Sequence, residues 1–236
     1  RMAIENGNYI KLSYTGSVNG APFDTTDAEE AKKAGIFREN AIYGPVVVKV
    51  GAGHVLPGVD TDLVGKEIGQ EYMVVVPAEK AFGKHKKDDL KAVNKKALPK
   101  KVAMFDRVTV EGREGVVVNK IGNRYLVDFN HPLAGQEVSY VYKIEAMVED
   151  QVEKLTGTIC LFTGREMKVS NAHKNFVSVE VLPMMAMYNQ NWMMTEYMIT
   201  QEAFGLFPEI ESVKFVESFP RPNLKIDEPA EEKKEE

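Results

Sequence analysis

The sequence has very little cysteine and no long apolar run, and each absence excludes a class of protein. Cys160 is the single cysteine, so the chain cannot form an internal disulfide, which suits a reducing compartment. No stretch approaches the roughly 20 apolar residues that a membrane-spanning helix needs. The first residues also lack the basic start, apolar stretch and cleavage site of a secretory signal. We therefore expect a globular protein of the cytoplasm.

Several catalytic signatures are missing as well. Gly51-Ala52-Gly53 begins like a dinucleotide-binding loop, but Leu56 stands where the third glycine belongs. Gly65-Lys66 resembles the end of a phosphate-binding loop, yet Glu67 follows it. The histidines are scattered, and no cysteine and histidine cluster has the spacing of metal ligands. The sequence therefore predicts neither a metal site nor a cofactor.

What the sequence does contain is an uneven distribution of charge. From Lys84 to Arg124 there are 12 Lys and Arg against 5 Asp and Glu, although the whole chain has a net charge of -5. From Asp150 to Glu236 acidic residues predominate, 15 against 9. A basic segment between acidic ones indicates separately folded parts with different surroundings.

The first part of the chain has the pattern of short strands around short helices. Alternating or β-branched residues predict strands at 9–16, 46–50, 72–76 and 138–147. A helix is expected at 28–34, with Thr26 and Glu29 at capping-box spacing, and a second from Pro57 to Gly65. This arrangement predicts a compact antiparallel α+β unit.

Two further regions follow different patterns. In the basic segment we expect a helix at 88–98 and then strands at 107–110, 115–121 and 124–129, which would form a small inserted β unit. After Asp150 we expect strands at 159–162, 176–182 and 213–219, with Cys160 as an inert core residue of the first. A helix at 184–204 carries apolar residues almost all round, and the Glu/Lys tail from Asp227 is expected to be disordered.

The strongest signal is the order of five separated segments. They are Tyr14, Phe23-Asp24, the run Gly-His-Val-Leu-Pro-Gly-Val at 53–59, Ala81-Phe82-Gly83, and the run Asn-His-Pro-Leu-Ala-Gly-Gln at 130–136 followed by Tyr140. This order resembles the FKBP-type peptidyl-prolyl cis-trans isomerases over residues 5–149. It is most similar to the SlyD-like and long archaeal branch, which has an insert-in-flap domain and a C-terminal extension.

The resemblance implies a fold and a domain division. The fold class is α+β, with an antiparallel FKBP-like half-barrel sheet around a short helix, a small β-rich inserted domain and a C-terminal α+β domain. The implied boundaries are 1–83 with 130–149 for the isomerase domain, 84–129 for the insert-in-flap chaperone domain, 150–226 for the C-terminal domain and 227–236 for the acidic tail.

The resemblance also implies a substrate pocket. Its lining would be Tyr14, Phe23, Asp24, Val55, Leu56, Val59, Phe82, His131, Leu133 and Tyr140. Val59 stands where many members have a large aromatic floor, and Phe82 stands where a tyrosine hydroxyl is common. Taken singly, each of these aromatic residues would be read as part of the core, and only their joint order indicates a site.

The implied function is that of a prolyl isomerase and folding chaperone without a cofactor. Its partners would be unfolded polypeptides with X-Pro bonds. The helix expected at 184–204, which is apolar almost all round, further predicts that the C-terminal domain makes a homodimer. The nickel-binding, histidine-rich tail of SlyD has no counterpart here. Two alternatives remain: a non-catalytic protein that only holds apolar segments, and a ribosome- or RNA-associated factor that uses the basic insert.

Overall fold

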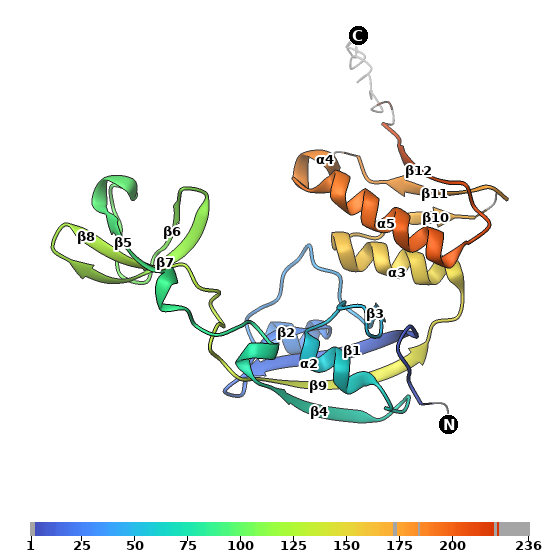
Figure 1. The fold of residues 1–236 in the computed structure, drawn as a ribbon, viewed down its shortest axis with the longest axis horizontal. Helices are drawn as coiled ribbons and strands as arrows, with labels where there is room; N and C mark the ends of the chain where they lie inside the picture. Colours follow the sequence, from blue (N-terminus) through green and yellow to red (C-terminus); the bar gives the residue numbers. More distant parts are fainter. Residues whose placement is uncertain (1–2, 172–173, 184, 220, 222–236) are drawn as a thin grey trace, which may run out of the picture.

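The computed structural model describes residues 3–171, 174–183, 185–219 and 221 (Figure 1). Within these residues the chain forms three separate β-sheets. In Figure 1 the middle part of the sequence stands apart from the rest, whereas the C-terminal part lies over the N-terminal sheet. The acidic tail expected at 227–236 lies outside the described residues.

The first sheet is antiparallel and has the strand order β2-β1-β9-β4, with β3 paired to β1. Its core includes Ile10, Leu12, Leu63 and Ile144, all fully buried. Two short helices accompany this sheet, as the sequence pattern predicts. The elements are β1 (Tyr9–Val18), β2 (Ala21–Thr25), α1 (Ala28–Lys33), β3 (Val46–Lys49), α2 (Pro57–Leu63), β4 (Glu71–Val76) and β9 (Val138–Met147).

The cap of α1 differs from the predicted one. Asp27, not Thr26, is the N-cap, and its carboxylate accepts a hydrogen bond from the Glu30 amide at 2.9 Å. Thr26 is already engaged with β1, because its Oγ1 accepts a hydrogen bond from the Tyr14 amide at 3.0 Å. A side chain that bridges a strand is not available to cap the helix that follows.

The second sheet lies in the inserted segment and is also antiparallel, with the order β5-β8-β7-β6. The helix predicted at 88–98 is wrong. That stretch forms a strand between two single turns of 3-10 helix, because its backbone pairs with β8 along one edge of the sheet. Pairing with a neighbouring strand outweighs the helix propensity of a lysine-rich segment. The elements are η2 (Lys87–Asp89), β5 (Leu90–Asn94), η3 (Lys95–Ala97), β6 (Arg107–Val110), β7 (Arg113–Ile121) and β8 (Arg124–Asp128).

The third sheet, of β10 (Lys168–Ser170), β11 (Phe176–Val181) and β12 (Ser212–Glu217), belongs to the C-terminal region. Strands β11 and β12 are parallel, so the chain between them must cross over the sheet. It does so through α4 (Met185–Tyr188) and α5 (Trp192–Leu206). The single helix predicted at 184–204 is therefore interrupted, and Met184 lies outside the described residues.

The strand predicted at 159–162 is also wrong, because these residues belong to α3 (Gln151–Thr163). Asp150 caps this helix through a hydrogen bond from the Glu153 amide at 2.7 Å, and Gly164 ends it in the left-handed conformation. Leu155 and Ile159 are fully buried at helical spacing. Cys160 is half-buried on this helix rather than in a core strand.

Helix α3 connects the C-terminal region to the first sheet. A Cβ atom on Gly157 would lie 2.3 Å from Val47 Cβ, so only glycine allows α3 to approach β3 so closely. Tyr9 of β1 is buried in the same apolar cluster as Leu155 and other C-terminal residues. The Lys11 Nζ atom lies 2.7 Å from Glu153 Oε1 across this contact. None of the described helices is long and apolar enough to cross a membrane.

Candidate active site

One cavity of about 610 Å³ is lined by all ten residues that the family resemblance assigns to the pocket. They come from β1, β2, the segment before α2, α2 itself, the segment after the turn η1 (Ala78–Lys80), the loop before β9, and β9. Gly53, His54 and Pro57 also line the cavity. These three were absent from the predicted set, although they stand in the same 53–59 run that supplied Val55, Leu56 and Val59.

Aromatic rings form much of the wall and pack against one another. The Phe23 ring meets Phe82 and Tyr140 edge-on, with ring centroids 5.5 and 5.9 Å apart. The rings of Phe82 and His131 are stacked at 4.5 Å. Such pairs stabilise the arrangement beyond the area they bury and hold each ring in one orientation. The wall is therefore a preformed apolar surface.

Gly16 on β1 makes this ring packing possible. A Cβ atom at this position would lie 2.8 Å from the ring of Tyr140 and 2.9 Å from that of Phe23. Any other residue would push both rings out of place. Gly16 and the rings of Tyr140 and Phe23 therefore pack as one unit. The pattern of residues along the sequence does not predict this contact.

The floor and one rim of the cavity are fixed by α2. Val59 on this helix is only 2% exposed, so it closes the bottom of the cavity with an aliphatic side chain. The Asp60 carboxylate accepts hydrogen bonds from the amides of Gly51 at 2.8 Å and Gly53 at 3.0 Å. The loop that leads into Val55 and Leu56 is thereby tied to the helix that follows it.

The polar groups of the cavity are a phenol and a carboxylate. The Tyr14 hydroxyl donates a hydrogen bond to Asp24 Oδ2 at 3.1 Å. Burial, and then the charge of Asp24, raise the pKa of Tyr14 above its ordinary value, and the same two causes raise the pKa of Tyr140. Both phenols are therefore protonated at neutral pH, and the site offers hydrogen-bond donors beside one negative charge.

The two histidines at the rim have structural partners. His131 Nδ1 accepts a hydrogen bond from the Leu133 amide at 3.0 Å, and His54 Nδ1 accepts one from the Lys49 amide at 3.0 Å. The His54 ring also meets Phe162 of α3 edge-on, with centroids 5.5 Å apart. Burial, and then the nearby Lys49, lower the pKa of His54, which favours the neutral ring. The C-terminal region thus contacts the wall of the cavity directly.

The cavity offers apolar shape and hydrogen-bond donors rather than a nucleophile with an adjacent base. Across the part of the chain that the structure describes, no three or more histidine, cysteine or carboxylate side chains are grouped so as to hold a metal ion. Such a site can hold an apolar ring and orient a neighbouring carbonyl group.

Comparison with known proteins agrees with this geometry. Residues 1–107 match the family described as FKBP-type peptidyl-prolyl cis-trans isomerase, and residues 151–220 match the family described as FKBP26_C-terminal. The first match ends before His131, Leu133 and Tyr140, which the fold nevertheless brings to the same cavity.

Curated relatives carry the same activity in their names. The Short-type peptidyl-prolyl cis-trans isomerase of Methanocaldococcus jannaschii is 29% identical over 151 residues, which are 60% of this chain and 92% of the relative. The FKBP-type isomerase SlyD of Treponema pallidum is 28% identical over 120 residues, 48% of this chain and 68% of the relative. SlyD of Escherichia coli is 28% identical over 128 residues, 50% of this chain and 63% of the relative. The resemblance and the fold class predicted from the sequence are confirmed: the chain carries an FKBP-type peptidyl-prolyl cis-trans isomerase domain and an FKBP26_C-terminal region, and it is similar to SlyD proteins.

Proposed function

We propose that the cavity lined by these ten residues, which we call the proline cavity, is where this isomerase catalyses the cis-trans isomerisation of X-Pro bonds. We also propose that the insert, residues 84–129, captures unfolded clients for it. The observation that carries the first part is the convergence of all ten residues, from separate segments, on one apolar cavity with a protonated phenol. We further propose that residues 1–83 with 130–149 form the isomerase domain, that 150–226 form a separate C-terminal domain, and that the protein acts in the cytoplasm.

The chemistry requires no covalent intermediate. Rotation about an X-Pro bond faces a barrier of about 20 kcal/mol because amide resonance must be broken. An apolar pocket that holds the prolyl ring favours the twisted amide, whose dipole is smaller, and each ~1.4 kcal/mol of preference gives a tenfold gain in rate.

Tyr14 and Asp24 fix the polar edge of the pocket. The Leu56 amide, which donates no hydrogen bond within the described residues, is placed to orient the substrate carbonyl.

Substitution of the polar pair tests this assignment. Asp24→Ala and Tyr14→Ala should each lower the turnover of a short prolyl peptide at least about tenfold, which corresponds to roughly 1.4 kcal/mol of transition-state stabilisation. Asp88→Ala, at an exposed aspartate of the insert, is the matched control and should leave turnover unchanged. Circular dichroism checks that each variant folds. Wild-type turnover in both folded pocket variants would remove the assignment.

The insert supports the capture role through apolar side chains that its own core does not use. Phe105 is 76% exposed and Ile121 is 61% exposed, whereas Val117 and Val127 are fully buried. Phe105 also has a φ of 68°, in the left-handed region that a bulky residue rarely adopts. An exposed aromatic ring on a strained backbone is unfavourable for folding alone and is consistent with a binding role.

We further propose that the C-terminal region pairs two copies of the chain. One face of α5 is buried through Trp192 and Ile199, and the opposite face exposes apolar side chains such as Met193, at 82%, and Met194. Flexible methionines suit an interface, and a two-fold dimer is the commonest arrangement among soluble oligomers. Sedimentation equilibrium should give twice 26.4 kDa at micromolar concentration, and a 26.4 kDa species would overturn the dimer.

A further inference from the structure

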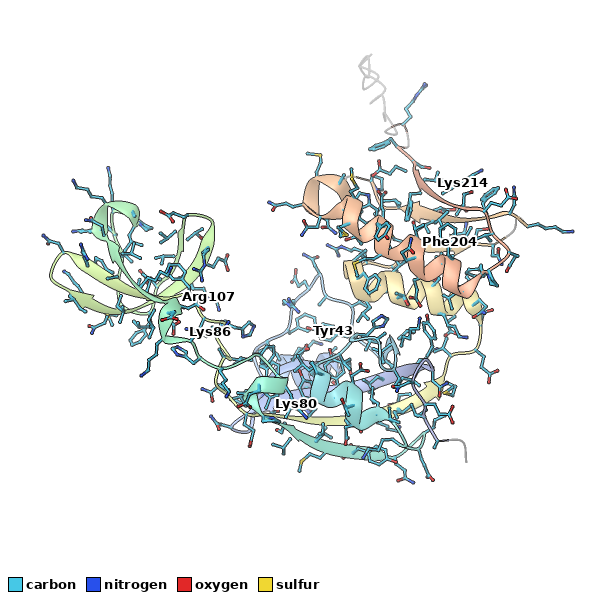
Figure 2. The ribbon with its side chains drawn as sticks, viewed as in Figure 1. Tyr43, Lys80, Lys86, Arg107, Phe204 and Lys214 are labelled. Atoms are coloured by element: carbon cyan, nitrogen blue, oxygen red, sulfur yellow. The ribbon has the colours of Figure 1, made fainter. Side chains whose placement is uncertain are left out.

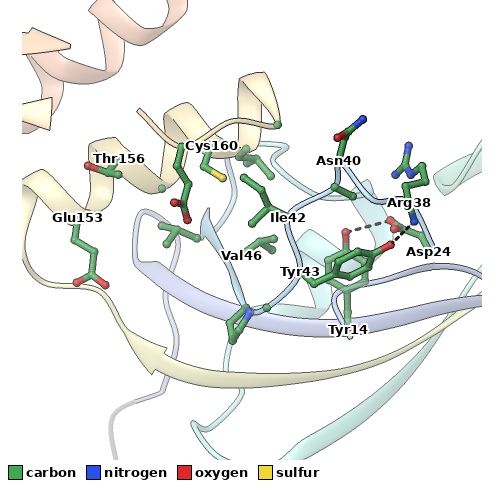
Figure 3. A pocket seen from close by; sticks show the side chains of 18 of the residues that line it. Tyr14, Asp24, Arg38, Asn40, Ile42, Tyr43, Val46, Glu153, Thr156 and Cys160 are labelled. Carbon is green, nitrogen blue, oxygen red and sulfur yellow. Dashed lines mark hydrogen bonds between the residues drawn. The ribbon is translucent and has the colours of Figure 1, made fainter. Parts of the chain in front are cut away.

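A second and larger cavity, of about 1140 Å³, lies directly beside the proline cavity and shares Tyr14 and Asp24 with it. We call it the α3 groove. One wall is the segment 38–47, and the other is α3 with the residues at its two ends. Figure 3 shows Tyr14 and Asp24 at one end, and Glu153, Thr156 and Cys160 of α3 at the other. The two cavities are therefore neighbours that share the side chains of Tyr14 and Asp24.

The walls of the α3 groove are connected to each other. Arg165, just after α3, donates a hydrogen bond from Nη1 to the Asn40 carbonyl at 3.3 Å. Within the segment 38–47, the Tyr43 hydroxyl accepts a hydrogen bond from the Arg38 amide at 3.1 Å, and Figure 2 shows Tyr43 between the first sheet and α3. The close contact of Gly157 on α3 with Val47 on β3 fixes the distance between these two walls of the groove. The groove is thus a built feature of the fold and depends on the C-terminal region.

The lining combines apolar and acidic side chains. Ile42, Val46 and Leu161 supply apolar surface. Of the described residues that line the groove, Asp24, Glu39, Asp150, Glu153 and Glu166 are acidic, and Arg38 is the one with a positive side chain. Lys11, which does not line the groove, forms an ion pair with Glu153. The other acidic side chains of the lining still outnumber its single positive one. The groove therefore favours a segment that is apolar or positively charged.

We propose that the α3 groove holds the stretch of the client polypeptide next to the X-Pro bond and selects for Lys and Arg in it. The inference rests on the proposed function of the proline cavity. A polypeptide with its proline in that cavity must extend past the rim, and Tyr14 and Asp24 line both that cavity and this groove. The same chain thus occupies both cavities, and the C-terminal region contributes substrate specificity to the isomerase.

The first test compares three prolyl peptides that share the same central sequence. One is flanked by lysines, one is flanked by glutamates, and one has no flanking residues. Since each exposed charge pair contributes only modestly, wild-type kcat/KM should be about threefold to tenfold higher with lysine flanks than with glutamate flanks. This ratio should fall as salt increases. In the double variant Glu39→Gln/Glu166→Gln it should fall by at least half. The control Glu209→Gln/Glu211→Gln removes two exposed carboxylates that do not line the groove, and it should keep the wild-type ratio.

The second test uses shape instead of charge. Thr156 is half-buried on the groove side of α3, so Thr156→Trp would fill the space without adding charge. We expect KM for the lysine-flanked peptide to rise at least about threefold, with turnover of the unflanked peptide unchanged. Cys160 supplies a readout that is independent of activity, because it is the chain's one cysteine and lines the groove. Its alkylation by iodoacetamide should be slowed by the lysine-flanked peptide and not by the unflanked one.

The outcomes separate the two proposals. If the wild-type protein does not turn over the unflanked peptide, the proposed function of the proline cavity fails. If it does, but flanking charge has no effect on kcat/KM and Cys160 alkylation is not slowed, the groove proposal alone is overturned. An unchanged ratio in Glu39→Gln/Glu166→Gln has the same meaning, because these side chains do not contribute to the proline cavity.

Discussion

The proline cavity and the insert use apolar side chains in opposite ways. In the cavity, Phe23, Phe82 and Tyr140 pack ring against ring, and the wall is backed by the first sheet. In the insert, a small core around Val117 and Val127 leaves Phe105 and other large apolar residues on the surface. The insert, residues 84–129, is small, and a small unit buries a smaller fraction of its apolar area than a larger domain does.

The difference corresponds to two tasks. A catalytic surface must favour one twisted geometry of the substrate, which requires side chains that are held in place. A capture surface must accept many sequences, which requires exposed apolar area with few geometric demands.

The largest effect is expected from replacement of Lys84–Phe129 by a short loop. Turnover of a short prolyl peptide should be nearly unchanged, because the ten cavity residues lie outside this segment. Proline-limited refolding of an unfolded protein should slow about a hundredfold, because capture raises the local concentration of prolyl bonds. Equal losses for peptide and protein substrates would contradict the division of tasks.

The second prediction concerns the rigidity of the cavity wall. Gly16→Ala places a Cβ atom against the rings of Tyr140 and Phe23, and overpacking of this kind costs about 1 to 3 kcal/mol. We expect kcat/KM for short peptides to fall at least about tenfold in a protein that still folds. Gly205→Ala is the matched control, because an added Cβ has nothing within 4 Å there. Normal activity of Gly16→Ala would show that the wall tolerates movement.

The third prediction concerns the exposed residues of the insert. Phe105→Ser and Ile121→Ser should each weaken the binding of an unfolded protein about threefold, with peptide turnover unchanged, because each removes part of an adaptable surface. Met73→Ser, at an exposed residue of β4, removes a similar side chain elsewhere and should have no effect. Fluorescence anisotropy of a labelled unfolded client gives the affinities. If Met73→Ser weakens binding equally, the client does not select the insert.

The smallest effect is expected from the pH dependence of His54. Its pKa is lowered in the folded protein, so the unfolded chain binds the proton more readily. The stabilisation is therefore complete above the ordinary pKa of about 6.5 and is lost as the pH falls below that value. Urea unfolding at about pH 7.5 and about pH 5.5 should show a larger loss for the wild type than for His54→Asn, whose amide oxygen can accept the same hydrogen bond. An equal loss would show that His54 is not the sensitive group.

Two segments differ from their predicted structure for one physical reason. The segments 88–98 and 159–162 were assigned from local propensity, and the structure reverses both. In the first, backbone pairing with β8 produces a strand, and in the second, a capped helix buries Leu155 and Ile159 on one face. The helix expected at 184–204 is interrupted before Trp192. For the segments 88–98 and 159–162, contacts distant in sequence outweighed the local propensity.

The amino-acid sequence alone was enough to predict the resemblance to the FKBP-type isomerases, the strands β1, β3, β4 and β9 of the first sheet and the ten residues that line the cavity, because these depend on local patterns and on the order of motifs along the chain. Tertiary structure decided how those residues meet: Gly16 beneath the rings of Tyr140 and Phe23, and Asp60 on the amides of Gly51 and Gly53. It also decided that α3 lies over β3 and so forms the α3 groove beside the proline cavity. Each of these contacts joins residues that neither the period of a strand nor that of a helix relates, so they exist only once the chain has folded.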